Sequence, residues 1–396
     1  MALPNPAPRD GQRLAQEGHR AASQSSRGVI GTWLNRPLWG QAVSRRTALL
    51  TLVGIGVAGA IAACGSAVTQ SDTEAGVASG TATAAGETVE LTLVSYAVTQ
   101  AAYEEIIPQF VEQWQAETGQ TVVINQSYGG SGSQTRAVLD GLEADVVALA
   151  LALDTQKLEE GGLIEPGWEE EAPNDAIVHK SVAVLVMRDG NPKNIQGWED
   201  LARPDVSVVT ANPKTSGGAR WNFMALWGQL TQTGVDEAIA LDYVTKVYQS
   251  VPVLPRNARE ATDVFYQRGQ GDVLINYENE VLLAALNGEV QPYIIPDVNI
   301  SIDNPIAVVD ANVDKHGTRE VAEAFVEFLF TPEAQRAFAR VGFRPVDPGV
   351  SEEFADQYPD IETLFTVDDL GGWDAVQSKF FADGAEFDKI QAKIGQ

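Results

Sequence analysis

The stretch ANPKTSGGARWN, residues 211–222, decides how this chain folds. The apolar run VSVVT before it is typical of a buried strand, and the residues after it carry apolar side chains at the spacing of a largely buried helix. Pro213 blocks the continuation of a preceding helix, and Ser216 is a good N-cap. By itself, this pattern is typical of an ordinary turn from a strand into a helix.

Two glycines open the expected helix. Gly217 and Gly218 have no side chains, so their N–H groups can come close to a ligand. The N-terminus of a helix favours an anion, because its first amides have no partner within the helix and its dipole is positive there. No Gly-Lys-Ser or Gly-Lys-Thr follows at the spacing of a Walker A loop. The stretch is therefore a candidate anion site of another kind.

A second glycine-rich turn, GGSGSQT at residues 129–135, strengthens this interpretation. It follows the strand-like TVVINQ and precedes a helix expected near Ser133, with Ser131 or Ser133 as its capping residue. The dinucleotide-binding fingerprint is the nearest alternative. Thr135 stands where its third glycine would be, and Asp145 opens a strand, whereas the ribose-binding acid follows one. We therefore reject a dinucleotide site.

The charge of the chain is distributed unevenly. Residues 1–63 carry seven arginines, no lysine and two acidic residues, a net charge of +5. The remaining residues carry 20 basic and 52 acidic groups, a net charge of −32, which brings the whole chain to −27. A basic leader before an acidic body is typical of an exported protein. The sequence pI of about 4.4 opposes nucleic-acid binding.

The leader contains two export-like motifs. SRRTALL, with Arg45 and Arg46, resembles a twin-arginine signal, although two of its residues depart from the commoner ones. The apolar stretch that follows ends IAAC, which resembles a bacterial lipobox with Cys64 as the lipidated residue. A short transmembrane helix is the alternative, but this stretch of 17 residues is at the lower limit for spanning. We expect residues 1–63 to be an export signal, by the twin-arginine or the general secretory route.

A flexible tether is expected at residues 64–88, which are small and polar and have no apolar periodicity. Cys64 is the only cysteine of the chain, so an intrachain disulfide is impossible. A domain on such a tether works beside the membrane without spanning it. We therefore expect an exported, periplasmic protein that is attached to the membrane only by a lipid on Cys64.

Strand-like and helix-like segments alternate from residue 89 onward. This alternation predicts mostly parallel sheets covered by helices, with ligand sites beyond the carboxyl ends of the strands. Both glycine-rich turns stand at such ends. We also expect a strand at residues 251–254 and an irregular, aromatic tail after residue 340.

Two further loops join this set. Residues 254–260 lead into a helix, with Asn257 as the expected N-cap, and present the amides of Ala258 and Arg259 at its positive end. Tyr277 stands at the carboxyl end of the strand-like DVLINY. Each loop alone is explained as well by a structural role.

Six motifs together resemble those of the periplasmic sulfate-binding proteins of ABC importers. In chain order they are VSYAVTQ, NQSYGGSGSQT, GLEADVVALALA, NPKTSGGARWN, GQGDVLINYENE and GGWDAVQ. The resemblance extends from residue 89 to the C-terminus and implies a type II periplasmic-binding-protein fold. This is an α/β fold of two lobes, each a mostly parallel sheet flanked by helices, with the ligand cleft between them. One lobe would hold residues 89–180 and 298–396, and the other residues 181–297.

The resemblance also implies a set of sulfate ligands. Ser131 would donate its hydroxyl, with its amide as a further donor. The other expected donors are the backbone amides of Ser216, Gly217, Gly218 and Ala258.

Two positions depart from the pattern of that family. Ala97 stands where the family usually has Asp, although the contact there is a backbone amide that Ala97 can still provide. Tyr277 stands where the family usually presents the indole of a Trp. Both changes keep an anion site, and they leave the choice among tetrahedral oxyanions more open.

The function that the resemblance implies is the binding of sulfate, or of thiosulfate, outside the cytoplasmic membrane and its delivery to the permease subunits of an ABC importer. We expect a monomer without cofactor or metal. One alternative is a binding protein for phosphate or molybdate, and the other is an exported hydrolase of sulfate or phosphate esters.

An enzyme lacks support in the sequence. The three histidines, His19, His179 and His316, are too scattered for a metal cluster or a catalytic triad. Glu278 and Glu280 are the only pair of carboxylates near the proposed site, and a solvated helix start explains them better than acid–base catalysis. We therefore expect a binding protein.

Three arginines, Arg136, Arg220 and Arg259, fall in the first turns of the three expected helices. Pairing with the many acidic residues explains them better than direct contact with the anion. Aimed N–H and O–H groups would then supply most of the stabilisation of the ligand.

Overall fold

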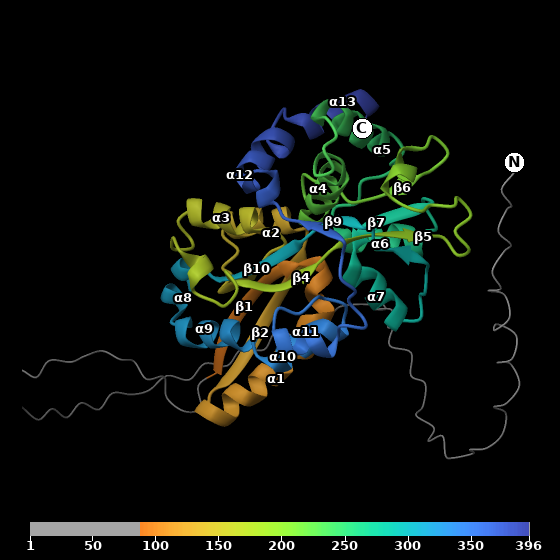
Figure 1. Cartoon of the computed structure of the whole chain (residues 1–396). Helices are drawn as coiled ribbons and strands as arrows, with labels where there is room; N and C mark the ends of the chain where they lie inside the picture. Colours follow the sequence, from red (N-terminus) through yellow and green to blue (C-terminus); the bar gives the residue numbers. More distant parts are fainter. Residues whose placement is uncertain (1–87, 396) are drawn as a thin grey trace, which may run out of the picture. The chain divides into compact units, whose positions relative to one another are not determined.

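The computed structural model describes residues 88–395. The predicted export signal, nearly all of the predicted tether and Cys64 lie outside the described residues. The described part of the chain forms two principal sheets with helices on both faces of each (Figure 1). None of its helices has the length and apolar character needed to cross a membrane.

The first lobe is built on a five-stranded sheet with the order β2-β1-β3-β10-β4. β1 runs parallel to β2 and β3, whereas β10 runs antiparallel to β3 and β4. Its strands are β1 (Thr88–Tyr96), β2 (Thr121–Gly129), β3 (Val146–Ala148), β4 (Ile177–Ser181) and β10 (Ile302–Val308).

The second lobe is built on a four-stranded sheet with the order β6-β7-β5-β8. β7 runs parallel to β6 and antiparallel to β5. Its strands are β5 (Ala183–Met187), β6 (Val208–Val209), β7 (Val273–Tyr277) and β8 (Tyr293–Ile294). A separate parallel pair joins β9 (Val298–Ile300) to β11 (Thr363–Phe365).

Both principal sheets are mixed, and this departs from the mostly parallel sheets that we expected. The antiparallel strands are those that arrive from another sheet. β5 follows β4 of the first lobe after one residue, and β10 follows β9 in the same way. Both strands run antiparallel to each of their neighbours.

Helices follow most of the strands along the chain and pack on the sheets. They are α1 (Gln100–Thr118), α2 (Ser131–Leu139), α3 (Ala152–Glu160), α4 (Gly217–Thr231), α5 (Glu237–Gln249), α6 (Ala258–Tyr266), α7 (Glu278–Leu286), α8 (Asp310–His316), α9 (Arg319–Phe328), α10 (Pro332–Arg340), α11 (Pro348–Glu353), α12 (Gly372–Val376) and α13 (Glu386–Ile394). Short 3-10 turns include η1 (Ala97–Thr99) and η3 (Trp198–Ala202), and η5 (Gln377–Phe381) is a π-helical turn.

Alternate strand residues build separate cores on the two faces of each sheet. Leu91 and Leu93 of β1 join the apolar cluster that includes Ile106 of α1. Val94, one residue further on, joins a different cluster with Leu158 of α3. Successive side chains of a strand point to opposite faces, so each strand is covered by helices on both sides.

The second sheet is covered in the same way. Ile275 of β7 lies in the cluster that contains Met224 of α4. Its neighbour Leu274 lies in the cluster that contains Phe265 of α6. The helix that begins at Gly217 is therefore fixed against this sheet by its buried length.

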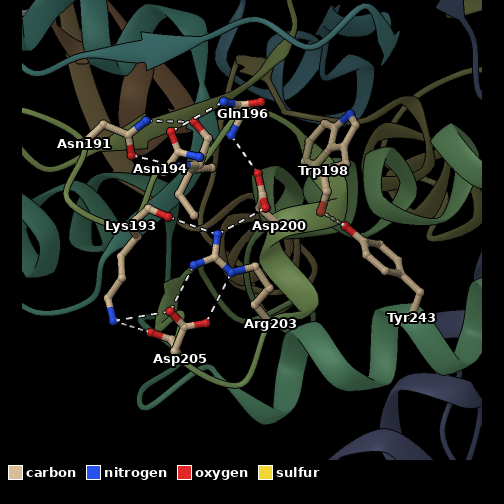
Figure 2. Close-up of polar contacts among 10 residues, drawn as sticks. Asn191, Lys193, Asn194, Gln196, Trp198, Asp200, Arg203, Asp205 and Tyr243 are labelled. Carbon is tan, nitrogen blue, oxygen red and sulfur yellow. Dashed lines mark hydrogen bonds and ion pairs between the residues drawn. The ribbon is translucent and has the colours of Figure 1, made fainter.

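Polar contacts close the loop between β5 and β6 (Figure 2). Arg203 binds the carboxylate of Asp205 with two contacts, of 3.2 and 3.0 Å, and donates to the carbonyl of Lys193 at 3.0 Å. The hydroxyl of Tyr243, on α5, donates to the carbonyl of Trp198. These bonds hold residues 193–205 together and join η3 to α5.

The C-terminal part of the chain returns to the second lobe. Figure 1 shows α13 beside α5 and α4, and Phe387 of α13 lies 5.4 Å from Tyr248 of α5 between ring centroids. We predicted that residues 298–396 belong to the first lobe; residues 363–395 contact β9, α4 and α5, and they also contact α3 of the first lobe. We propose lobe boundaries at Val182 and Ser301, with residues 363–395 counted in the second lobe.

Three local predictions are wrong. Residues 251–254 form no strand, and the tail that we expected to be irregular contains α11, α12 and α13. α2 begins at Ser131, two residues before the expected start, and its N-cap is Gly130, which provides no side-chain cap. Ser131 and Ser133 are therefore not capping residues.

Candidate functional site

A small pocket lies where three helices begin and two long strands end. The space that its walls enclose is small. The lining residues are Tyr96, Ala97, Val98, Gly129, Gly130, Ser131, Ala150, Ser216, Gly217, Gly218, Asn257, Ala258 and Tyr277.

All seven residues that we predicted as ligands line this one pocket, namely Ala97, Ser131, Ser216, Gly217, Gly218, Ala258 and Tyr277. They come from the ends of β1 and β7 and from the starts of α2, α4 and α6. The fold therefore brings together residues that are up to 180 positions apart in the sequence. That they bind the ligand remains a prediction.

The start of α4 has the cap that the sequence predicts. The hydroxyl oxygen of Ser216 accepts a hydrogen bond from the amide of Ala219 at 3.2 Å. The amide of Ser216 itself donates to the carbonyl of Asn212 at 2.9 Å. Ser216 is thus placed to offer the hydrogen of its hydroxyl to a ligand in place of the amide that we expected. The next amides, of Gly217 and Gly218, have no partner within the helix.

The start of α2 also differs from the expectation. The hydroxyl of Ser131 donates to Oδ2 of Asp154 at 2.7 Å and accepts from the amide of Ala150 at 3.0 Å. A hydroxyl has only one hydrogen, and Ser131 gives it to a carboxylate that is fully buried. The amide of Ser131, at the first position of α2, is the donor that remains for a ligand.

The start of α6 agrees with the sequence. The side-chain oxygen of Asn257 accepts from the amide of Glu260 at 2.9 Å, as an N-cap does. Asn276, on β7, donates to the carbonyl of Ala258 at 2.9 Å and so holds the first turn of the helix in place. The amide of Ala258 faces the pocket at the positive end of this helix.

Two glycines of α4 are required by the close approach of their neighbours. A Cβ at Gly217 would lie 2.6 Å from the Cβ of Ala150 in the first lobe. A Cβ at Gly218 would lie 2.5 Å from Cε2 of Tyr277. Both distances are too short for carbon atoms that are not bonded. These glycines therefore let the helix start sit against both the first lobe and the Tyr277 ring.

Tyr277 contributes a hydroxyl without a protein partner. Its side chain is 1% exposed, and no described residue forms a hydrogen bond with its Oη atom. Burial raises the pKa of Tyr277 well above its usual value, so the phenol keeps its hydrogen. A buried polar group without a partner is uncommon, and this one lies at the wall of the pocket.

Sequence reasoning missed Tyr96. Its hydroxyl is also buried without a protein partner, and its ring centroid lies 6.0 Å from that of Tyr277. Burial raises its pKa as well. The signal in the sequence was its position directly before Ala97, in a loop already assigned to the site.

The charged groups around the pocket are paired with one another. Arg259 binds Glu280 with contacts of 2.7 and 3.0 Å, and Arg344 binds Glu278 at 2.7 Å. These pairs account for both carboxylates that we considered for acid–base chemistry. No lining residue of the pocket carries a charged side chain.

The other two arginines also contact groups of the protein. Nη1 of Arg220 lies 3.4 Å from Oδ1 of Asp154, and Arg136 donates to the hydroxyl of Ser133 at 3.3 Å. Within residues 88–395, no group of three or more His, Cys, Asp or Glu side chains is arranged to hold a metal ion. The arrangement is that of a neutral, donor-rich pocket for a small anion.

Comparison with known proteins places this fold and pocket in a family. The family described as bacterial extracellular solute-binding protein matches residues 91–344 of the chain. The chain belongs to this family.

Three proteins illustrate what this solute-binding protein is similar to. A sulfate-binding protein of Synechocystis sp. is 56% identical over 347 residues, which cover 87% of this chain and 97% of the relative. The solved structure of the sulfate-binding protein SubI from Mycobacterium tuberculosis H37Rv has a TM-score of 0.68 and 38% identity, and covers 74% of this chain and 99% of that one. A thiosulfate-binding protein of Pseudomonas aeruginosa is 38% identical over 300 residues, which cover 75% and 90% of the two chains.

Proposed function

We propose that this solute-binding protein binds sulfate, with thiosulfate as a second ligand, outside the cytoplasmic membrane and delivers it to the permease subunits of an ABC importer. The observation that carries the proposal is the pocket in which three helix N-termini converge without any charged side chain in the lining. The sulfate-binding and thiosulfate-binding names of the relatives support the same class of ligand.

The chemistry of a dehydrated dianion explains why donors are gathered there. Removal of an ion from water costs tens of kcal/mol by Born reasoning. Each helix dipole offsets only about 0.3–2 kcal/mol of this. Hydrogen bonds to the ionised oxygens must supply most of the rest, since such bonds are about twice as strong as neutral ones. The donors that we assign to this task are the amides of Ala97 and Ser131 in the first lobe, the amides of Gly217, Gly218 and Ala258 in the second lobe, and the hydroxyls of Ser216 and Tyr277.

The balance of donors and acceptors selects among anions. Sulfate carries no hydrogen at neutral pH and needs donors alone, whereas phosphate is partly protonated and its O–H needs an acceptor. A site of amides leaves that hydrogen without a partner, at a cost of about 1–3 kcal/mol. The phenol oxygens of Tyr277 and Tyr96 in the lining differ from the amides, because each can accept as well as donate. We therefore expect a preference for sulfate that is weaker than in a site of donors alone.

Calorimetric titration of the ligand-free full-length protein with sulfate, thiosulfate, phosphate and molybdate tests this proposal. Sulfate or thiosulfate is expected to bind at least tenfold more tightly than the other two, a difference of about 1.4 kcal/mol. If phosphate or molybdate binds more tightly than sulfate, the assignment of the ligand is wrong.

The hydrolase alternative requires a different set of side chains. Glu278 and Glu280 are both held by arginines, and the relatives are named as binding proteins. Incubation of the protein with aryl sulfate and aryl phosphate esters is expected to release no phenol. A turnover that disappears with Glu280→Gln would show instead that the site is catalytic.

The route to the cell surface completes the proposal. The leader resembles an export signal, and the family is one of extracellular proteins. We propose that the mature chain starts at Cys64, that a lipid on this residue anchors it, and that the protein acts as a monomer. No nucleic acid and no cofactor has a part in this function.

A further inference from the structure

The side chain of Lys214 points from the loop of the pocket to the C-terminal end of the chain. Its Nζ atom donates to the carbonyl oxygens of Phe381 and Ala382 at 3.1 and 3.3 Å and binds Oδ1 of Asp388 at 2.8 Å. An ammonium group has three hydrogens, so these three acceptors satisfy all of them. Lys214 therefore joins residues 211–216, which we call the anion loop, to residues 366–395, which we call the C-terminal segment.

The C-terminal segment is itself held in place by aromatic packing against α4. Phe380 lies 4.9 Å from Trp227 of α4 between ring centroids, and Trp373 lies 4.7 Å from Trp221 of the same helix. Oδ2 of Asp388 accepts from the amide of Gly384 at 2.7 Å, which fixes the carboxylate. The segment thus contacts both the body of α4 and the loop that precedes its N-terminus.

The anion loop is bonded to the residues that precede α6 and leads directly into α4, so it contacts both helix starts that carry proposed donors. Asn212 accepts from the amide of Ser216 and donates its own amide to the carbonyl of Pro255 at 2.8 Å. The hydroxyl of Thr215 donates to the carbonyl of Arg256 at 2.7 Å. Residues 255–256 lead directly into α6. A shift of the anion loop would therefore move the starts of both α4 and α6.

We propose that Lys214 is a positioning residue that holds the anion loop on the C-terminal segment and so sets the geometry of the donors of α4 and α6. This inference rests on the proposed function, because it assigns to these donors the binding of sulfate. Lys214 is absent from the lining of the pocket, so it acts through the loop and not on the ligand.

A direct electrostatic role for Lys214 makes the opposite prediction for its partner. If the cation attracted sulfate from a distance, removal of the negative charge of Asp388 would tighten binding. If Lys214 positions the loop, removal of that charge weakens the contact and hence the binding. The sign of the effect of Asp388→Asn therefore separates the two roles.

Sulfate titration of the Lys214→Met and Asp388→Asn variants and of the double variant measures this effect. We expect each single variant to bind sulfate about tenfold more weakly, the size of one lost hydrogen bond to a charged group. The double variant should be no weaker than Lys214→Met, since both changes break the same contact. Lys214→Arg keeps a donor for the carboxylate and should recover part of the affinity.

Lys379→Met is the matched control. Lys379 lies in the same segment and forms an ion pair of 2.7 Å with Glu237 of α5, but it contacts no residue of the anion loop. This variant should bind sulfate within about twofold of the wild type. An equal loss of affinity in Lys379→Met and Lys214→Met would mean that only the packing of the segment matters, and would overturn the role of Lys214.

Hydrogen exchange of the ligand-free proteins tests the positioning without reference to sulfate. The amides of residues 212–219 should exchange faster in Lys214→Met and Asp388→Asn than in the wild type and Lys379→Met. If the wild type binds no sulfate or thiosulfate, the proposed function fails, and faster exchange would still show that Lys214 holds the loop. Unchanged exchange, or tighter sulfate binding by Asp388→Asn, would refute the inference.

Discussion

Removal of the Tyr277 hydroxyl is the most direct test of the pocket. The change Tyr277→Phe keeps the ring, which fills the space beside Gly218, and removes only the Oη atom. That atom is buried and forms no hydrogen bond with a described residue. Its loss therefore breaks no contact of the ligand-free protein, whose thermal stability should stay the same or rise slightly.

The expected loss appears only when sulfate is bound. A hydrogen bond to a charged group is worth about 1.5–3 kcal/mol. The sulfate dissociation constant of Tyr277→Phe should therefore rise by about 10- to 150-fold, since 1.4 kcal/mol corresponds to a factor of ten. Tyr277→Trp offers a donor without an acceptor, so it should keep sulfate affinity and discriminate more strongly against phosphate, provided that the larger ring fits beside Gly218.

Calorimetric titration with sulfate and phosphate at neutral pH, combined with thermal melts of the ligand-free proteins, measures both effects. Tyr248→Phe is the control, because this phenol is also fully buried with an unpartnered hydroxyl but lies on α5, away from the pocket. It should leave sulfate binding unchanged. If Tyr277→Phe binds sulfate as tightly as the wild type does, the hydroxyl is not a ligand and the reasoning fails.

Four further predictions follow from the same structure. Gly218→Ala should weaken sulfate binding at least tenfold and lower the melting temperature, because its Cβ would meet the Tyr277 ring at 2.5 Å; wild-type titrations and melts would contradict this close approach. Burial lowers the pKa of His179 to about 3, so between pH 6.5 and 3 the unfolded chain binds a proton that the folded chain does not, and this residue should cost about 1 kcal/mol of stability between pH 7 and 5.5. Urea unfolding at both pH values should show a loss of stability that is larger in the wild type than in His179→Phe by about this amount, and an equal loss in the two proteins would refute it. Intact-mass spectrometry of membrane-extracted protein should show an acylated N-terminal Cys64, and a mature form that retains Met1 would exclude this. Small-angle scattering should show compaction on addition of sulfate, because the proposed donors come from both lobes; an unchanged radius of gyration would argue against closure.

Prediction from the sequence succeeded where the decisive interaction is local. Ser216 and Asn257 were recognised as caps because an N-cap bonds to an amide three residues ahead in the chain. The turns that carry the predicted ligands were found for the same reason, since each combines a strand end, a glycine or a cap, and a helix start. The alternation of strands and helices likewise determined the α/β class.

The tertiary structure alone decided how each group is used. Ser131 gives its hydrogen to Asp154, which is 23 residues away in sequence, and nothing near Ser131 in the chain indicates that acceptor. The C-terminal tail was expected to be irregular, but α4 and α5 offer an aromatic surface against which its short helices fold. The mixed sheets have a similar origin, because β5 and β10 enter from the other lobe. A local pattern determines which residues can donate a hydrogen bond at a helix start. Whether each donor already has an acceptor within the protein depends on residues from distant parts of the chain, which come close only when the chain has folded.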